Sequence, residues 1–141
     1  MIAWLWRLLP RRLAGYAWAA PVSLLGVLMA LLARSSGGMW RRHEGVLEAA
    51  GGWTGWLLQH ALPGFPIAAI TLGHVVLARN DEWLTRTRRH ERVHVAQYTR
   101  WGLLFPLAYV IVSLLAWLAG RPAYRGNCFE IEAYRVDDPG I

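Results

Sequence analysis

Two histidines one helical turn apart, His90 and His94, flank Glu91 in the pattern His-Glu-x-x-His. Residues i and i+4 lie above one another on a helix, so both imidazoles can face a single metal ion. Zn²⁺ accepts neutral imidazole nitrogens at about 2.0–2.1 Å and lowers the pKa of a bound water to about 7. The glutamate would lie beside the ion, where it can take a proton from that water. The pattern therefore predicts His90 and His94 as metal ligands, Zn²⁺ as the cofactor and Glu91 as the general base.

A site of this kind needs a third protein ligand, and the best candidate is the carboxylate of Glu130. This residue lies in a short polar segment near the C-terminus that is predicted to be helical. On a helix Glu130 shares a face with Ala133, Tyr134 and Asp137, whereas Glu132 points elsewhere. We therefore expect Glu130 to complete the metal site.

The elements that position these residues follow from local sequence. Residues 67–78 are rich in β-branched side chains and predict a strand. Asp81 can cap a helix over residues 82–100, and Glu82 suits the positive end of that helix. A later helix is predicted over residues 127–136. The expected fold class is therefore mainly α with a small β element (α+β).

The N-terminal region is strongly hydrophobic. Residues 13–33 form a charge-free run of 21 residues, and a helix of that length reaches about 31 Å, enough to cross a bilayer. A cleaved signal peptide is the alternative, but Leu31-Leu32-Ala33 lacks the small residue expected three places before a cleavage site. We expect a retained anchor helix over residues 1–34, followed over residues 35–141 by the domain that contains the metal site.

The composition favours association with a membrane. Of 141 residues, 55% are hydrophobic and 17% are charged, compared with about 25% charged residues in soluble domains. All 15 basic residues are arginine and the net charge is +6, which favours anionic lipid as a partner. Because no nucleic-acid-binding motif is recognisable, nucleic acid is not expected. The single cysteine, Cys128, excludes an intrachain disulfide and is expected to be a small buried hydrophobic residue.

A second charge-free run, residues 101–120, raises a question of topology. If it crossed the bilayer once, the two histidines would lie about 30 Å from Glu130 and could not share an ion with it. We therefore expect a helix that is buried against the N-terminal helix and the strand region, or that lies in the membrane interface. If the run does span, His74 or Glu82 becomes the preferred third ligand. Otherwise His74 is expected to be a core or cleft histidine.

The strand, the His-Glu-x-x-His helix and the later glutamate-bearing helix resemble the gluzincin class of zinc metallopeptidases. That class takes its third ligand from Glu-x-x-x-Asp or Glu-x-x-Ala-Asp. Here Tyr134 stands where Asp would be expected, and Asp137, one turn later, could substitute for it beside a ligand histidine. The resemblance covers roughly residues 70–137 and implies a minimal gluzincin-like core and peptide hydrolysis. It also implies that the strand before the zinc helix pairs with extended substrate, so that residues 71–76 would line the cleft.

The segment His94-Val95-Ala96-Gln97 is also similar to the His-Val-x-Gln continuation found in small bacterial proteins with the same motif. The leading hypothesis is a zinc-dependent peptide hydrolase associated with the bacterial inner membrane, with a peptide or protein substrate and lipid as partners. The alternative is a small non-enzymatic membrane protein in which the motif is accidental or binds a structural ion. Hydrolysis of lipids or small molecules by the same metal-activated water is a third, less favoured hypothesis.

Overall fold

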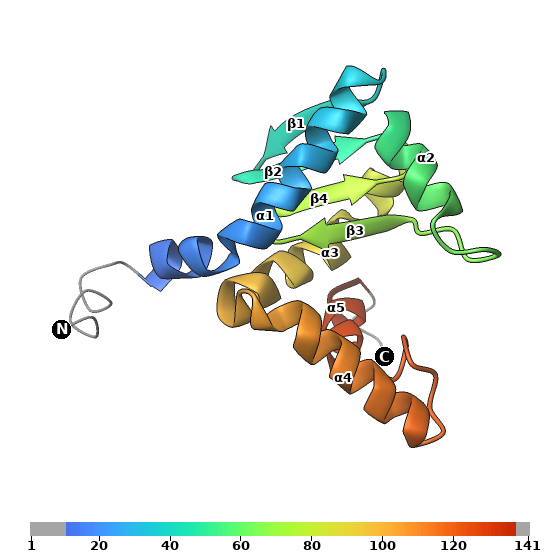
Figure 1. The fold of residues 1–141 in the computed structure, drawn as a ribbon. Helices are drawn as coiled ribbons and strands as arrows, with labels where there is room; N and C mark the ends of the chain where they lie inside the picture. The colour runs from blue at the N-terminus through green and yellow to red at the C-terminus, as the bar shows by residue number, and fades with distance from the viewer. Residues whose placement is uncertain (1–10, 138–141) are drawn as a thin grey trace.

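The computed structural model describes residues 11–137, in which helices surround a four-stranded sheet (Figure 1). In chain order the elements are α1 (Arg11–Ser35), β1 (Met39–His43), β2 (Val46–Ala50), α2 (Gly52–His60), β3 (Ala69–Leu72), β4 (Val75–Ala78), α3 (Asp81–Trp101), α4 (Leu104–Leu118) and α5 (Cys128–Asp137). This arrangement confirms the predicted mainly α fold with a small β element. It also confirms a helix around His90 and His94 and a helix around Glu130.

The sheet has the order β1-β2-β4-β3. β1 and β2 form an antiparallel hairpin that turns at Glu44 and Gly45, both of which have positive φ (46° and 82°), as a two-residue hairpin turn of type I′ requires. β2 and β4 are parallel, with α2 in the connection between them, and β4 pairs antiparallel with β3. The free edges of the sheet are therefore β1 and β3.

The single strand predicted over residues 67–78 is wrong, because the chain reverses in the middle of it. Gly73, with φ +64°, turns β3 into β4. A side chain at this position would also collide with Ser23 of α1, since a Cβ built on Gly73 would lie 2.1 Å from the Ser23 hydroxyl oxygen. A lone glycine in a run of β-branched residues is a signal for such a reversal, and it decides the topology here.

The sheet is covered on both faces. Successive residues of a strand point to opposite faces, and those of β2 and β4 pack accordingly. Ala49, Val75 and Leu77 pack with Ala30 and Ala33 of α1, whereas Val76 and Ala78 pack with residues of α3. α1 lies in front of the sheet and α3 lies behind it in Figure 1. The N-terminal helix therefore shares a hydrophobic core with the strands.

The start of α3 is held in place by polar contacts. Asn80, rather than the predicted Asp81, caps the helix by accepting a hydrogen bond from the Trp83 backbone N–H at 3.0 Å. Further along, the fully buried carboxylate of Glu48 in β2 pairs with Arg88 of α3 and Arg41 of β1. Burial opposes the ionisation of Glu48, but the two guanidinium groups outweigh it and lower its pKa. This ion-pair cluster joins two strands to the helix that contains the histidines.

α4 rules out one of the two arrangements expected for it. The axis bends by 113° between α3 and α4, at the break around Gly102. Burial of residues 101–120 against the N-terminal helix and the strands is wrong, because only Phe105 and Ala116 are buried within α4; a position in the membrane interface stays a prediction. α5 then returns the chain to the side of α3, where the two helices pack together. Cys128, at the start of α5, is exposed and not the buried residue expected.

Candidate metal centre

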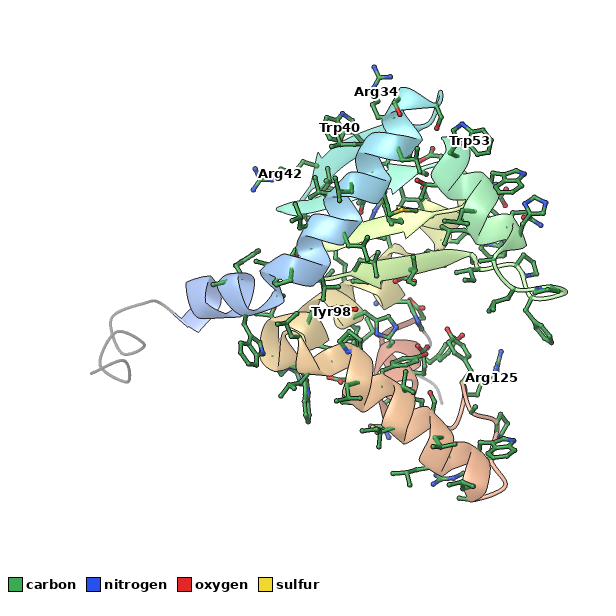
Figure 2. The ribbon with its side chains drawn as sticks, viewed as in Figure 1. Arg34, Trp40, Arg42, Trp53, Tyr98 and Arg125 are labelled. Atoms are coloured by element: carbon green, nitrogen blue, oxygen red, sulfur yellow. The ribbon has the colours of Figure 1, made fainter. Side chains whose placement is uncertain are left out.

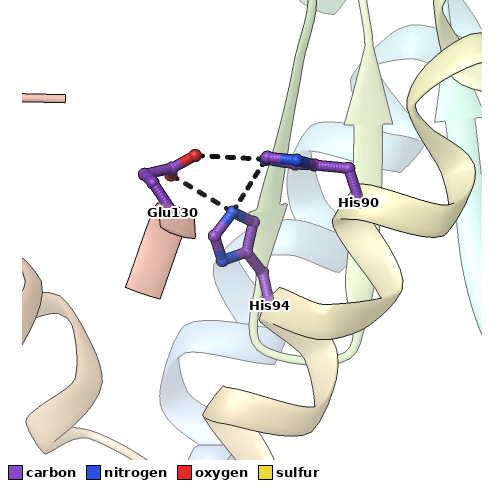
Figure 3. Close-up of side chains that lie close together, drawn as sticks. All are labelled: His90, His94 and Glu130. Atoms are coloured by element: carbon purple, nitrogen blue, oxygen red, sulfur yellow. Dashed lines mark hydrogen bonds and ion pairs between the residues drawn. The ribbon is translucent and has the colours of Figure 1, made fainter. Parts of the chain in front are cut away.

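The structure brings together His90 and His94 of α3 and Glu130 of α5 (Figure 3). The two Nε2 atoms lie 3.2 Å apart, and each lies 3.2 Å from a different oxygen of the Glu130 carboxylate. Adjacent ligand atoms of a tetrahedral ion with bonds of about 2.0–2.1 Å lie about 3.3 Å apart. All three side chains are buried. These residues could therefore hold a metal ion between them.

Gln97 sets the protonation of His94. The Gln97 Nε2 donates to the Phe129 carbonyl at 3.0 Å and to Glu132 at 2.9 Å, so its Oε1 must point the other way, toward His94 Nδ1 at 2.8 Å. An amide oxygen can only accept, so the proton of a neutral His94 lies on Nδ1. The Nε2 lone pair is then directed at the centre of the site, as a metal ligand requires.

His90 is supported from the opposite side. Its Nδ1 lies 3.5 Å from the Asp137 carboxylate, which favours a proton on that nitrogen and leaves the Nε2 lone pair free. Tyr134 packs its ring against the His90 imidazole, with centroids 4.7 Å apart in an edge-on arrangement. Tyr134 and Asp137 therefore both lie beside His90. Asp137 is next to a ligand histidine, as the resemblance implies.

The charge at the centre of the site favours a bound cation. Glu130 Oε2 is buried and accepts no hydrogen bond, although it faces the His90 Nε2 atom. Burial would raise the pKa of Glu130, but the two histidines and the Tyr109 hydroxyl hold it well below its ordinary value. The pKa of His94 is raised against the effect of burial, because Glu130 and Glu91 both face it. A proton on one of the histidines or a metal ion between the three side chains would balance the negative charge of Glu130.

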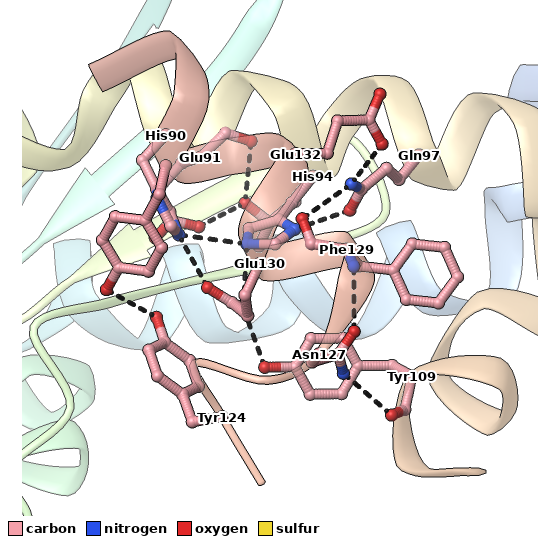
Figure 4. A network of polar contacts seen from close by, with 12 residues as sticks. His90, Glu91, His94, Gln97, Tyr109, Tyr124, Asn127, Phe129, Glu130 and Glu132 are labelled. Atoms are coloured by element: carbon pink, nitrogen blue, oxygen red, sulfur yellow. Dashed lines mark hydrogen bonds and ion pairs between the residues drawn. The ribbon is translucent and has the colours of Figure 1, made fainter. Parts of the chain in front are cut away.

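Glu91 lies next to this cluster without belonging to it. Figure 4 shows Glu91 close to His90 and His94. The Glu91 carboxylate accepts a hydrogen bond of 2.6 Å from the Thr71 hydroxyl on the edge strand β3. Burial raises the pKa of Glu91, and the Thr71 hydroxyl and the two histidines only partly offset that rise. A raised pKa suits a carboxylate that must both accept and return a proton near neutral pH. Glu91 is therefore a buried carboxylate beside the cluster, held by the Thr71 hydroxyl.

α4 also contributes to the site. The Tyr109 hydroxyl donates to Glu130 at 2.8 Å. Asn127, directly before α5, donates to the Tyr109 carbonyl at 3.1 Å and to the Ser113 hydroxyl at 2.8 Å. Nothing in the spacing of the motif indicated Tyr109. The sequence could have identified Gln97 as the hydrogen-bond partner of His94, because it lies three residues later on the same helix face.

The alternative third ligands lie elsewhere. His74 stacks on Tyr16 of α1, with ring centroids 4.0 Å apart, and its ring nitrogens contact the hydroxyls of Ser23 and Thr99. Burial lowers the pKa of His74, so it is a neutral core histidine. Glu82 is exposed at the start of α3 and pairs with Arg86. Neither residue joins the cluster.

The position of the sheet edge also needs correction. Residues 71–76 do not form one edge, since Val75 and Val76 belong to β4, which is paired on both sides. The edge next to Glu91 is β3, and among the residues predicted to line the cleft it is Thr71 that contacts the glutamate. Among residues 11–137, β3 is the edge strand on this side, so its outer backbone groups can pair with an extended peptide.

Gln97 provides a test of the metal centre. We expect Gln97→Leu to weaken metal affinity by about 10- to 100-fold, because the His94 imidazole loses the partner that fixes its proton on Nδ1. Competition with a chromogenic chelator measures the change. Gln59→Leu, at an exposed position of α2, is the matched control and should leave affinity unchanged. Equal affinity of the Gln97 variant and the wild type would contradict this role.

Comparison with known proteins identifies no relative. No protein-family model matches the chain, and no curated protein or solved structure shows significant similarity to it. The function must therefore be argued from the site itself.

Proposed function

We propose that this chain is a membrane-associated, zinc-dependent hydrolase that cleaves peptide bonds. The observation that supports this most strongly is the convergence of His90, His94 and Glu130 beside Glu91, which Thr71 holds in place. Two imidazoles and one carboxylate form a donor set typical of catalytic zinc sites, in which the fourth position is left for water or substrate. In the part of the chain that the structure describes, no fourth histidine, cysteine or acidic residue joins the cluster. This favours catalysis over a closed structural site.

The roles of the residues follow from their positions. His90, His94 and Glu130 would hold the ion, which supplies Lewis acidity and a lowered pKa for water. Glu91 takes the proton of the attacking water and transfers it to the leaving amine. Thr71 orients Glu91 through its hydroxyl. The free edge of β3 can pair with an extended peptide and would align the scissile bond with the metal centre.

The membrane part of the proposal rests on α1. Residues Gly15–Ser35 form a helix long and apolar enough to cross a bilayer, although a signal sequence or a core helix has the same properties. The arginine-rich composition and the exposed hydrophobic side chains both favour contact of this protein with lipid.

Removal of the metal tests the proposal. We expect the full chain, purified in detergent, to hydrolyse an unfolded protein substrate and to lose that activity about 100-fold or more on dialysis against a chelator. One equivalent of Zn²⁺ should restore it. Activity that survives complete removal of the metal would refute the proposal. A tightly bound ion in a protein without any hydrolytic activity would instead favour the structural alternative.

A further inference from the structure

The apolar surfaces of α1 and α4 indicate how this protein meets a membrane. We propose that both helices lie in the plane of one leaflet of an anionic bilayer, and that neither crosses it. This inference rests on the proposed membrane association but not on the proposed hydrolysis.

One face of α1 is docked on the domain along the length of the helix. The residues of this face are small, and they are three, four or seven positions apart: Gly15, Ala19, Gly26, Ala30 and Ala33. The three alanines are fully buried, and a Cβ added to Gly15 or Gly26 would collide with Thr99 or Val75. Ser23, between them, bonds to His74. α1 therefore contacts the domain from its first described turn to its last.

This docking is incompatible with α1 as an isolated span. All four strands contact α1, so a helix perpendicular to the membrane would draw the sheet into the hydrocarbon with it. β1 is a free edge, and it exposes Arg42. Unpaired backbone groups and arginine side chains are costly in lipid. If α1 lies parallel to the surface instead, the sheet stays on the aqueous side.

The other face of α1 is exposed and apolar. It comprises Tyr16, Trp18, Leu24, Leu25, Leu28, Leu31 and Leu32, each more than 40% exposed. The small residues of the inner face let α1 pack closely against the domain, and the large apolar side chains project outward, where lipid can cover them.

α4 presents a similar surface. No charged residue occurs between Trp101 and Gly120, and the exposed side chains of the helix are Leu104, Leu107, Val110, Ile111, Leu114, Leu115, Trp117 and Leu118. Its 15 residues reach about 22 Å, which is short of the about 30 Å of a bilayer core. Moreover, Tyr109 in the middle of α4 bonds to Glu130 on the aqueous site. α4 therefore cannot cross the bilayer while this contact exists.

The two surfaces adjoin. The Trp18 indole N–H of α1 donates to the Trp101 carbonyl at 2.7 Å, and Gly102 leaves room for the Trp18 ring. α1 and α4 both lie toward the viewer in Figure 1, and Figure 2 shows side chains projecting from both helices in the same view. We call these two adjoining sets of exposed apolar side chains the α1–α4 face.

The distribution of charge favours anionic lipid as the occupant of this face. Residues 1–43 contain six arginines and residues 92–129 contain four, and neither segment has an acidic residue. Exposed arginines lie near the ends of α1 and α4: Arg34 and Arg121, and also Arg100, which pairs with Glu132. A second copy of this chain would bring like charges together, whereas anionic headgroups neutralise them.

The depth of α1 in the bilayer tests the proposal directly. In a Cys128→Ser background, single cysteines replace Ala17, Leu24 and Leu31, which are exposed and seven residues apart, so they lie on one side of α1 at intervals of about 10 Å. A fluorophore at each position is quenched by lipids that bear a quencher at defined depths, in vesicles of phosphatidylcholine and phosphatidylglycerol. We expect the same shallow depth, about 5–10 Å, at all three positions. A label at Leu24 about 10 Å deeper than the other two would show a crossing helix and overturn the proposal. An absence of quenching at all three positions would overturn it too.

α4 is tested by vesicle flotation of the full chain. The double variant Leu107→Glu, Leu114→Glu should bind at least about tenfold less to these vesicles, because two exposed leucines of the α1–α4 face become charged. Leu62→Glu, at a loop leucine of similar exposure (53% against 52% for Leu114), is the matched control and should bind as the wild type. Unchanged binding of the double variant would overturn the role of α4. Neither measurement involves hydrolysis, so an inactive protein that gives these results would refute the proposed hydrolysis and leave this inference intact.

Discussion

Glu91→Gln is expected to lower peptide hydrolysis by about 10²–10⁴-fold, the contribution of a positioned general base, while the protein still binds its metal. Gln has the shape of Glu and can still accept the Thr71 hydrogen bond, so the buried position should tolerate it. It cannot take a proton from water, however. The measurements are initial rates on an unfolded protein substrate and the metal content of the same preparation.

The control for this variant is Glu82→Gln, on the same helix but exposed and remote from the cluster. It should leave both rate and metal content unchanged. If Glu91→Gln retained full activity, Glu91 would have no part in the mechanism. If it lost the metal together with the activity, the glutamate would be needed to form the site, and its role as a base would stay untested by this variant alone. Single-turnover rates in a preparation with metal restored would then isolate the chemical step.

Glu130→Ala is expected to remove most of the bound metal, with a loss of affinity beyond the 10- to 100-fold typical of residues that only support a ligand. The substitution takes away one of three donors and leaves His90 and His94 without their anionic partner. Elemental analysis of the purified variant measures the loss. The pKa of His94 should also fall, since Glu130 is the main group that raises it.

His74→Ala is the matched comparison, because His74 is an alternative third ligand that the sequence allows. This residue contacts Ser23 and Thr99 rather than the metal cluster. We therefore expect this variant to be less stable but to bind stoichiometric metal. The reverse result, with metal lost on removing His74 and kept on removing Glu130, would refute the assignment of the site.

The parts of the structure that local sequence could predict are the helices α1, α3, α4 and α5 and the metal motif. The spacing of His90 and His94 indicated a shared ion because a helix has a fixed period, and Glu130 was selected by its chemistry and its position on the later helix. The β1–β2 hairpin and α2 were not predicted, since their residues include charged and glycine-rich stretches with no clear periodicity. The turn at Glu44 and Gly45 was the available signal.

Tertiary context explains the remaining differences. Asn80 caps α3 instead of Asp81 because the chain leaves β4 with Asn80 in an extended conformation, which suits a capping residue. The exposure of α4 could not be inferred from its hydrophobicity, because a buried helix and a lipid-facing helix have the same composition. The support of Glu130 by Tyr109 depends on the bend before α4, which no short motif predicts.

The three ligands come from α3 and α5, and the chain connects these two helices through α4. An ion bound between them would therefore close a loop, and it would bind only to the folded chain. A ligand with this preference stabilises the native state by about 2.7 kcal/mol at a concentration 100 times its dissociation constant. If these residues hold a metal ion, its supply would therefore be linked to folding, and removal of the ion would lower the free energy of unfolding.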